Sequence, residues 1–267
     1  MRLAEKRLVL LDLDGTLYLG ERPYDGAGEF LRYLLRTGRR YRFLTNNSSR
    51  SRADYLQKME RLDLPAREED FLTSADALEA YLLRRRPAGE LYYVLGTASL
   101  REQLCRAGFR LTDRPEAEVS ALLCGLDTEL TYRKLEDACQ LLFRGADFIA
   151  THLDWACPAP YGFAPDCGCI CEMLRRTTGR RPTVVGKPRP EMALLAMERT
   201  GCAPAETLMV GDRLNTDIAC GVNAGIDTAL LLTTGETFAH ADRYPKRPTE
   251  IYPDIGALLQ AWKEADA

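Results

Sequence analysis

Long hydrophobic runs are absent from this 267-residue sequence. The longest, Met192 to Met197, has six apolar residues, whereas a membrane-spanning helix needs about 18. The chain also reaches Asp12 before any apolar stretch of the length that a signal peptide requires. We therefore expect no membrane span, no membrane partner and a cytoplasmic location.

An excess of one charge is missing as well. The chain has 36 basic and 39 acidic residues, for a net charge of −3. Its short arginine clusters come without an aromatic stacking motif, so they predict solvated helix ends rather than a nucleic-acid surface. The nine cysteines are an odd number, and without an export signal we expect free thiols and no disulfide framework.

What the sequence does contain is a repeated alternation of strand and helix at both ends of the chain. The predicted strands are 8–11, 40–44, 182–185, 207–210 and 228–232, and the predicted helices are 30–36, 52–62, 191–200, 217–223 and 258–265. Such alternation favours an open parallel sheet covered by helices. The expected fold is therefore α/β, with a Rossmann-like parallel sheet at its core.

The middle of the chain carries strand–helix units of its own. Strands are predicted at 91–95, 121–124 and 147–150, and helices at 99–107, 131–144 and 170–178. We therefore expect residues 1–75 and 183–267 to form the core domain and residues 76–182 to form an inserted second α/β domain. Neither the spacing nor the composition indicates an oligomeric state, and a homo-oligomer stays possible.

Two aspartates follow the first apolar strand, in the run Asp12-Leu13-Asp14-Gly15-Thr16. Residues i and i+2 on a strand point to the same side, and ligands of open α/β sheets bind beyond the carboxyl ends of the strands. Two carboxylates this close repel each other, and a divalent cation such as Mg²⁺ relieves the repulsion. A solvated aspartate pair in a turn is the alternative, which the Gly-Thr continuation disfavours.

Further polar clusters follow three other predicted strands. Thr45-Asn46 offers a hydroxyl and backbone N–H groups suited to phosphate oxygens, although it can equally be an ordinary helix cap. Lys187 lies between glycine and proline, and Asp212 and Asp217 follow the strand at 207–210. Taken singly these are a surface lysine and a helix start with acids. Together, at the ends of one predicted sheet, they indicate a single site.

This ordered set of motifs resembles the haloacid dehalogenase (HAD) superfamily. Three details, Thr45-Asn46-Asn47-Ser48, Gly186-Lys187-Pro188 and the segment from Gly211 to Ile218, are similar to those of the class IIA, NagD-like or para-nitrophenylphosphatase-like, phosphatases. The resemblance covers nearly the whole chain. It implies that the inserted domain is the α/β cap of that class, of type C2.

The resemblance also implies a role for each motif position. Asp12 is expected to be the nucleophile that forms an aspartyl-phosphate, and Asp14 the general acid and then the base. The side chains of Asp12 and Asp212 and the backbone carbonyl of Asp14 are expected to bind Mg²⁺. Thr45, Asn46 and Lys187 are expected to hold the phosphoryl oxygens, with Asp217 acting behind them through a water or through Lys187.

An aspartate at position 14 distinguishes reactions within the superfamily. It implies a leaving group that needs a proton, which favours hydrolysis of a small phosphomonoester over dehalogenation. Sugar phosphates, nucleoside monophosphates, phosphoglycolate and pyridoxal phosphate are all open as substrates. The alternatives are a phosphoryl transferase with the same intermediate and, less favoured because the carboxylates are all present, a non-catalytic regulator that binds phosphometabolites.

Two loops in the inserted domain lie where the family keeps its substrate contacts. The chain has His152 and Asp166 where relatives usually have asparagine and glycine, and it retains Asp154. These three polar residues are the predicted substrate loop of the cap. A water-facing loop histidine is the alternative for His152.

Four cysteines, Cys157, Cys167, Cys169 and Cys171, cluster beside these loops. Their spacing is not that of a paired zinc-binding motif. Cys167 and Cys171 share a helix face only if the helix begins there. Free, partly buried thiols are the favoured interpretation and structural zinc the alternative.

Overall fold

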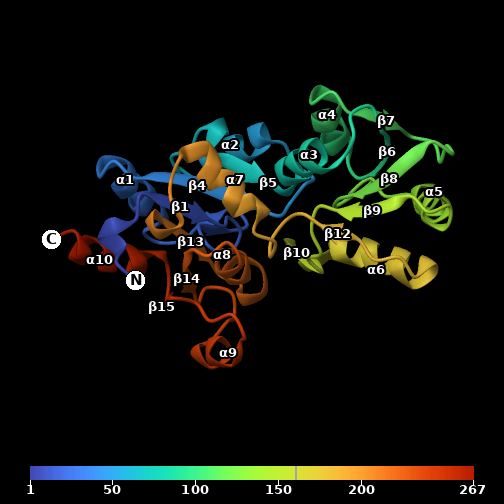
Figure 1. The fold of residues 1–267 in the computed structure, drawn as a ribbon. Helices are drawn as coiled ribbons and strands as arrows, with labels where there is room; N and C mark the ends of the chain where they lie inside the picture. The colour runs from blue at the N-terminus through green and yellow to red at the C-terminus, as the bar shows by residue number, and fades with distance from the viewer. Residues whose placement is uncertain (160) are drawn as a thin grey trace. The chain divides into compact units, whose positions relative to one another are not determined.

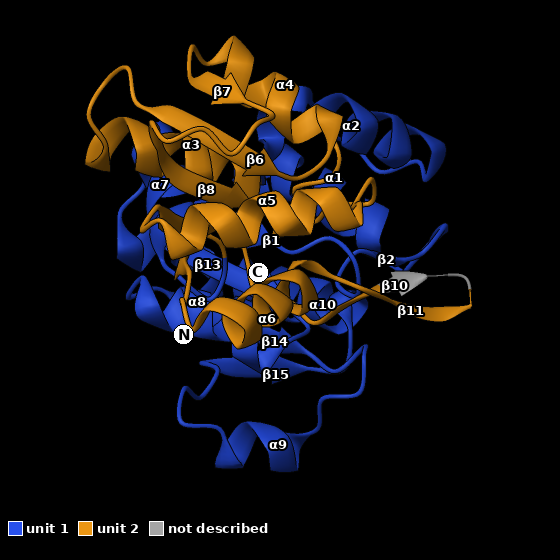
Figure 2. Cartoon of the chain, turned by 90° about the vertical axis from the view of Figure 1, so that its right-hand side faces the viewer, with its two compact units in different colours: residues 1–45, 52–72, 187–267 blue, residues 46–51, 73–186 orange. Residues whose placement is uncertain are grey.

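A computed structural model describes residues 1–159 and 161–267. The chain divides into two compact units (Figure 2): unit 1 contains residues 1–45, 52–72 and 187–267, and unit 2 contains residues 46–51 and 73–186. These bounds differ by a few residues from the predicted division. The larger difference is that residues 46–51, expected in the core domain, belong to unit 2.

Unit 1 is built on a six-stranded sheet with the order β15-β14-β13-β1-β4-β5 (Figure 1). Its strands are β1 (Leu8–Leu11), β4 (Arg40–Thr45), β5 (Phe71–Thr73), β13 (Thr207–Gly211), β14 (Asp227–Leu231) and β15 (Glu250–Tyr252). The pairs from β15 across to β4 are parallel. β1 is buried at every residue, as a strand covered on both faces of a parallel sheet must be.

Helices complete unit 1. They are α1 (Ala27–Arg36), α2 (Arg52–Arg61), α7 (Glu191–Thr200), α8 (Ala219–Asn223), α9 (Phe238–Arg243) and α10 (Ile255–Ala265). A short antiparallel pair, β2 (Tyr18–Leu19) and β3 (Arg22–Pro23), follows β1. Phe30 on α1 meets Trp262 on α10 with ring centroids 5.7 Å apart, so the two ends of the chain share one apolar core.

Unit 2 is built on a five-stranded parallel sheet with the order β12-β9-β8-β6-β7. Its strands are β6 (Leu91–Leu95), β7 (Arg110–Thr112), β8 (Val119–Cys124), β9 (Asp147–Ala150) and β12 (Thr183–Val184), beside a hairpin of β10 (Ala156–Ala159) and β11 (Gly162–Pro165). Its helices are α3 (Ser74–Arg85), α4 (Ala98–Arg106), α5 (Tyr132–Phe143) and α6 (Cys167–Thr178). The α/β prediction is confirmed.

Three details of the predicted arrangement are wrong. The strand expected at 182–185 in the core forms as β12, but it pairs with β9 in unit 2. Helix α6 begins at Cys167 instead of residue 170, because the Asp166 carboxylate accepts a hydrogen bond from the Cys167 backbone and caps the helix. Helix α3 was not predicted, although Thr73 and Asp76 form a capping box at its start.

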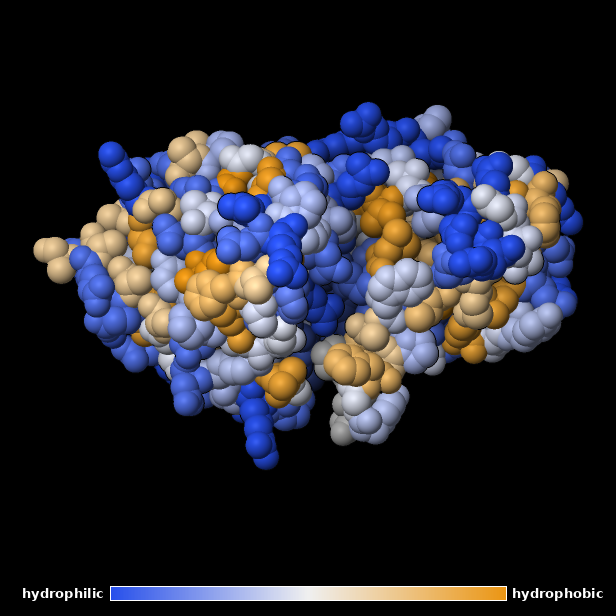
Figure 3. Space-filling model, turned by 90° about the horizontal axis from the view of Figure 1, so that it is seen from below, coloured by the Kyte–Doolittle hydropathy of each residue, from blue (hydrophilic) through white to orange (hydrophobic). Residues whose placement is uncertain are grey.

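Hydrophilic residues cover much of the face drawn in Figure 3, and hydrophobic side chains form separate patches on it. Within the described residues, no helix combines the length and the hydrophobicity that crossing a bilayer demands.

Candidate active site

Lys187 is the centre of the polar cluster in unit 1. Its ammonium group lies 2.5 Å from Asp12 Oδ1 and 2.7 Å from Asp217 Oδ1, and it also donates to the Leu44 carbonyl at 2.9 Å. Asp12 directly follows β1, whereas Lys187 begins the last segment of unit 1. Segments far apart in sequence thus bring one buried cation to two carboxylates.

Asp212 directly follows β13, and its buried carboxylate is held by hydroxyl groups. Thr16 donates to its Oδ1 at 3.0 Å, and Thr234 donates to its Oδ2. Gly15 has a positive φ of 97°, and a Cβ atom there would lie 2.5 Å from Asp212 Oδ2. The glycine of the Asp-Gly-Thr run therefore lets the backbone after β1 approach this carboxylate.

Three carboxylates converge in this cluster, since oxygens of Asp12, Asp212 and Asp217 lie within 4.8 Å of one another. Burial raises the pKa of Asp12 well above its usual range, Lys187 opposes the rise, and the two other aspartates add to it. Burial and Asp217 likewise raise the pKa of Asp212, against the hydrogen bond from Thr234. A second positive charge would stabilise all three as carboxylates.

The donor atoms therefore fit a hard divalent cation. Oxygen-only ligands at a site with several negative charges are what Mg²⁺ selects. Lys187 and Arg213, whose Nε lies 4.0 Å from Asp212 Oδ2, carry two positive charges against three carboxylates. The predicted set of Asp12, Asp14 and Asp212 includes two of the three converging side chains. The third, Asp217, is engaged by Lys187 and also accepts from the Arg213 backbone at 3.2 Å.

Asp14 lies beside a cation that sequence reasoning missed. The Lys58 ammonium group, on α2, lies 3.5 Å from Asp14 Oδ1 and 3.9 Å from the ring centroid of Tyr18. The Tyr18 hydroxyl is 3.4 Å from Asp14 Oδ2. Lys58 is almost fully buried, with 6% of its side chain exposed, whereas 37% of the Asp14 side chain is exposed. Lys58 and Asp14 are 44 residues apart in the sequence and meet only in the folded chain. No local sequence motif could therefore have predicted the contact of Lys58.

The predicted phosphate-binding pair at the end of β4 is divided between the units. Thr45 ends β4 in unit 1, and Asn46 belongs to unit 2. The Asn46 side-chain amide donates to both Asp154 oxygens at 3.2 Å, and the Asn46 backbone carbonyl accepts from the Ser74 hydroxyl. Ser48 Oγ lies 3.3 Å from Thr151 Oγ1. These contacts explain why residues 46–51 belong with the inserted domain.

The predicted substrate loop of unit 2 forms a cluster around His152. This histidine is fully buried, with Nδ1 at 3.6 Å from Asp154 and Nε2 at 3.6 Å from Asp166. Among the described residues, Nε2 has no hydrogen-bond partner. Burial raises the pKa of Asp166, and His152 opposes the rise. The structure therefore brings all three predicted residues together, and the water-facing alternative for His152 is wrong.

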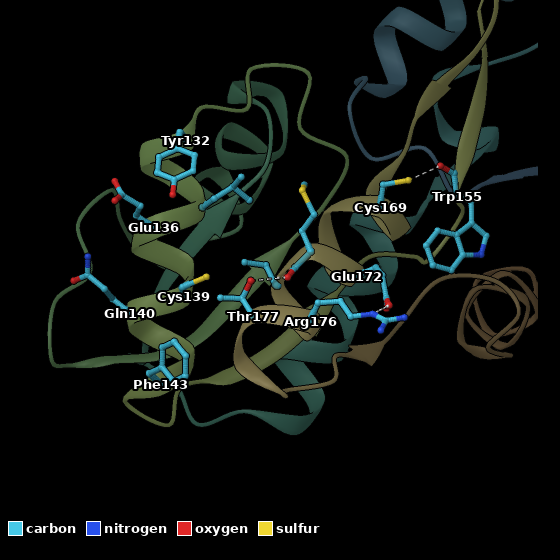
Figure 4. Close-up of a pocket in the computed structure, with 13 residues that line it drawn as sticks. Tyr132, Glu136, Cys139, Gln140, Phe143, Trp155, Cys169, Glu172, Arg176 and Thr177 are labelled. Atoms are coloured by element: carbon cyan, nitrogen blue, oxygen red, sulfur yellow. Dashed lines mark hydrogen bonds and ion pairs between the residues drawn. The ribbon is translucent and has the colours of Figure 1, made fainter.

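Unit 2 also has a groove of about 800 Å³ between α5 and α6 (Figure 4). Tyr132 and Phe143 on α5 and Trp155 and Glu172 on the other side are among its lining residues. None of the predicted site residues lines it, so the groove is separate from the cluster around His152.

Comparisons with known proteins confirm the predicted superfamily. Two family models match the chain: one of haloacid dehalogenase-like hydrolases over residues 9–110, and a second HAD-hydrolase-like model over residues 184–258. An acid sugar phosphatase of Staphylococcus haemolyticus is 34% identical over 250 residues, which is 94% of each chain. The chain belongs to the HAD hydrolases.

Solved structures of HAD hydrolases share the fold over almost the whole chain. A 4-nitrophenylphosphatase from Thermotoga maritima superposes with a TM-score of 0.90 at 34% identity, covering 98% of this chain and 99% of its own. A glycerol phosphate phosphatase from Mycobacterium tuberculosis, in complex with magnesium, superposes with a TM-score of 0.91 at 32% identity. The match covers 98% of this chain and 79% of that protein's chain. NagD from Escherichia coli has a TM-score of 0.85.

These relatives confirm the class IIA, NagD-like assignment. They also confirm the predicted enzyme class, phosphoric monoester hydrolase, since the named relatives are phosphatases. No residue of the candidate site is tested by them, so the roles of the individual residues stay predictions.

Proposed function

We propose that this HAD hydrolase is a Mg²⁺-dependent phosphatase of small phosphorylated metabolites that acts through an aspartyl-phosphate on Asp12. The observation that carries the proposal is the buried group of Asp12, Lys187, Asp212 and Asp217, which combines a nucleophile, a fixed cation and hard ligands for a second cation. Such a group matches the needs of phosphoryl transfer, which are positioning and neutralisation of charge.

In the first step, a carboxylate oxygen of Asp12 forms a bond to phosphorus while the bond from phosphorus to the leaving oxygen breaks. Asp14 gives its proton to that oxygen, so the product leaves as a neutral alcohol. The partial exposure of Asp14 supports this role, since its side chain has to reach a leaving group outside the buried cluster. Lys58 and Tyr18 hold Asp14 in place.

In the second step, Asp14 takes a proton from a water molecule whose oxygen forms a bond to the same phosphorus. The bond to Asp12 breaks, phosphate is released and both aspartates return to their starting states. Burial lowers the pKa of Lys187, but Asp12 and Asp217 raise it by more, so the side chain carries a positive charge beside Asp12. This charge is therefore available to Asp12 and to phosphoryl oxygens.

Mg²⁺, held by the side chains of Asp12 and Asp212 and the backbone carbonyl of Asp14, would neutralise negative charge on the group in transfer. Thr16 and Thr234 fix the Asp212 carboxylate for this purpose. Thr45 and Asn46, together with Lys187, would bind the phosphoryl oxygens, and Asp217 would orient Lys187.

Substrate selection is assigned to the cluster around His152 in unit 2. Asp154 contacts both His152 and the Asn46 amide, so it connects the cap residues to a proposed phosphate ligand. Because His152 is fully buried, we assign it an indirect role through Asp154 and Asp166. Relatives named acid sugar phosphatase and glycerol phosphate phosphatase make sugar and polyol phosphates the first substrates to test.

The test is hydrolysis of para-nitrophenyl phosphate by the purified protein with and without Mg²⁺, followed by a panel of phosphorylated metabolites. We expect metal-dependent phosphate release and a preference among sugar, polyol, nucleoside and other small phosphates. Absence of turnover on every phosphomonoester in the presence of Mg²⁺ would contradict the proposal. Transfer of phosphate to an added alcohol in preference to water would instead favour a phosphoryl transferase.

A further inference from the structure

Three cysteines of unit 2 meet in its core, and the phosphatase mechanism uses none of them. Cys124 ends β8, and Cys167 and Cys171 lie on the first turns of α6. The Cys171 sulfur is 3.8 Å from that of Cys124 and 3.9 Å from that of Cys167. All three sulfurs lie within 4.8 Å of one another, and all three residues are buried.

The distances between the sulfur atoms match those between thiolates bound to one metal ion. A zinc–sulfur bond of about 2.3 Å places two sulfurs roughly 3.8 Å apart in a tetrahedral site and roughly 4.0 Å apart in a trigonal one. A disulfide would need about 2.05 Å, and all nine cysteines are free thiols. We propose that Cys124, Cys167 and Cys171 form a binding site for a thiophilic cation of the zinc and copper(I) class.

The chemistry around the three sulfurs favours such a cation over Mg²⁺. Three oxygens accept weak hydrogen bonds from, or donate them to, these sulfurs: the Cys124 carbonyl, 3.8 Å from Cys167 Sγ, the Gly125 carbonyl, 3.9 Å from Cys124 Sγ, and Thr151 Oγ1, 4.0 Å from Cys167 Sγ. Thiolates select soft and borderline cations, whereas carboxylates and carbonyls select hard ones. The thiol site is therefore chemically distinct from the aspartate cluster of unit 1.

Binding needs no change of oxidation state. The thiols that become ligands lose their protons to solvent as sulfur–metal bonds form, so protons are released in proportion to the number of thiolates. Because Cys124 ends a strand and the other two begin a helix, the ion would cross-link β8 to α6. Its expected effect is a higher melting temperature of unit 2.

The remaining cysteines of the region supply matched controls. Cys169 lies on α6 between the two ligands, but its sulfur donates to the Trp155 carbonyl at 3.1 Å. Cys169 and Cys139 both line the groove in Figure 4. The Cys157 sulfur donates a hydrogen bond to the Ala164 carbonyl on the neighbouring strand at 3.8 Å. Of the four cysteines that cluster in the sequence, only Cys167 and Cys171 belong to the group of three sulfurs. The third member, Cys124, is distant from them in sequence.

The experiment adds Cd²⁺ to reduced, metal-free full-length protein and follows the ultraviolet sulfur-to-cadmium charge-transfer band. We expect the band to saturate at one Cd²⁺ per chain and to decline when Zn²⁺ competes. Cd²⁺ bound to the aspartate cluster gives no sulfur band, so the result is independent of the proposed phosphatase function. Native mass spectrometry gives the stoichiometry.

The variants assign the ligands. Cys171→Ala, which removes the sulfur common to both short contacts, should abolish the band, whereas Cys139→Ala and Cys169→Ala should retain it. Circular dichroism establishes that each variant is folded. The absence of a band in the wild-type protein would overturn the proposal even if Cys171→Ala fails to fold. A band that survives Cys171→Ala and disappears in Cys169→Ala would overturn it as well.

Discussion

At the scale of single residues, the proposed chemistry of unit 1 depends on the contacts of Lys187. A buried ammonium group contacts both Asp12 and Asp217, and it opposes the rise that burial causes in the pKa of Asp12. Removing either aspartate would leave a buried cation with one partner fewer, which costs stability as well as activity. For this reason, a test of Asp12 needs a variant that keeps both its volume and an oxygen that can accept a hydrogen bond from Lys187.

Asp12→Asn should abolish phosphatase activity and leave the fold intact. The amide has nearly the same volume as the carboxylate, but it is a poor nucleophile and a poor ligand for Mg²⁺. Steady-state turnover of para-nitrophenyl phosphate measures the activity, and circular dichroism measures the fold. Turnover close to wild type in the folded variant would rule out a covalent role for Asp12.

Lys58→Met should reduce kcat because it removes the cation beside Asp14. The unbranched apolar replacement keeps the packing of the lysine stem, and loss of the 3.5 Å contact leaves Asp14 less well oriented. A misplaced proton donor costs about ten-fold or more in rate, with little change in KM.

Lys263→Met is the matched control, since Lys263 forms an ion pair with Glu29 on the surface of the same unit. An equal effect of both substitutions on kcat would show that lost charge in general, rather than the contact with Asp14, is responsible.

The fact that Lys58 was missed has a simple cause. Helix α2 is predictable from its spacing, but the carboxylate that it faces depends on how it packs.

At the scale of elements, the carboxyl ends of β1 and β13 carry the residues that sequence reasoning selected. Asp12 follows β1, and Asp212 follows β13, its parallel neighbour in the sheet. A buried apolar strand that ends in acids is a local signal, and parallel pairing brings the two strand ends to one edge. This is why the centre of the site could be predicted from the sequence.

The loop after β9 shows where local signals are insufficient. The resemblance predicts substrate contacts for His152, Asp154 and Asp166. In the structure, each of the three contacts other residues of unit 2. Asp166 caps α6 and His152 is fully buried. A sequence pattern identifies polar residues in a loop, but it does not tell whether a histidine faces solvent or two carboxylates.

His152→Asn should change the relative kcat/KM among phosphorylated metabolites. The shorter side chain cannot contact Asp154 and Asp166 together, so the two carboxylates of the proposed substrate loop change position. One altered hydrogen bond to a substrate group is worth about ten- to a hundred-fold. A substrate panel that includes para-nitrophenyl phosphate measures the change.

The aryl phosphate is the internal control for this variant, since a small aryl group has the least need of cap contacts. A uniform change across the panel would mean that His152 supports the chemistry or the stability of unit 2. An altered order of substrates with an unchanged rate on the aryl phosphate would support its role in selection.

At the scale of the whole molecule, the proposed function assigns chemistry to one compact unit and substrate selection to the other. Their existence could be predicted because each has its own strand–helix rhythm. Their bounds could not, because residues 46–51 and β12 are held in unit 2 by tertiary contacts such as the pairing of Thr183 with Ile149. Short segments between units have too few residues for a periodic signal.

Removal of Mg²⁺ by a chelator should eliminate activity without unfolding the protein. The core of unit 1 is an apolar cluster that includes Phe30, Phe43 and Trp262, and burial of this kind stabilises a chain of this length without a metal. Far-ultraviolet circular dichroism before and after chelation is the measurement. Loss of the folded signal would show that a metal is required for the fold.

The most direct test of the central claim is to trap the phosphorylated enzyme. Mixing the protein with Mg²⁺ and a rapidly hydrolysed phosphomonoester, followed by quenching with borohydride, reduces an aspartyl-phosphate to homoserine, and peptide mass spectrometry locates it. We predict homoserine at position 12, formed only when substrate and Mg²⁺ are both present. Reduction at another aspartate, or an unmodified Asp12 in an enzyme that is turning over, would contradict the account.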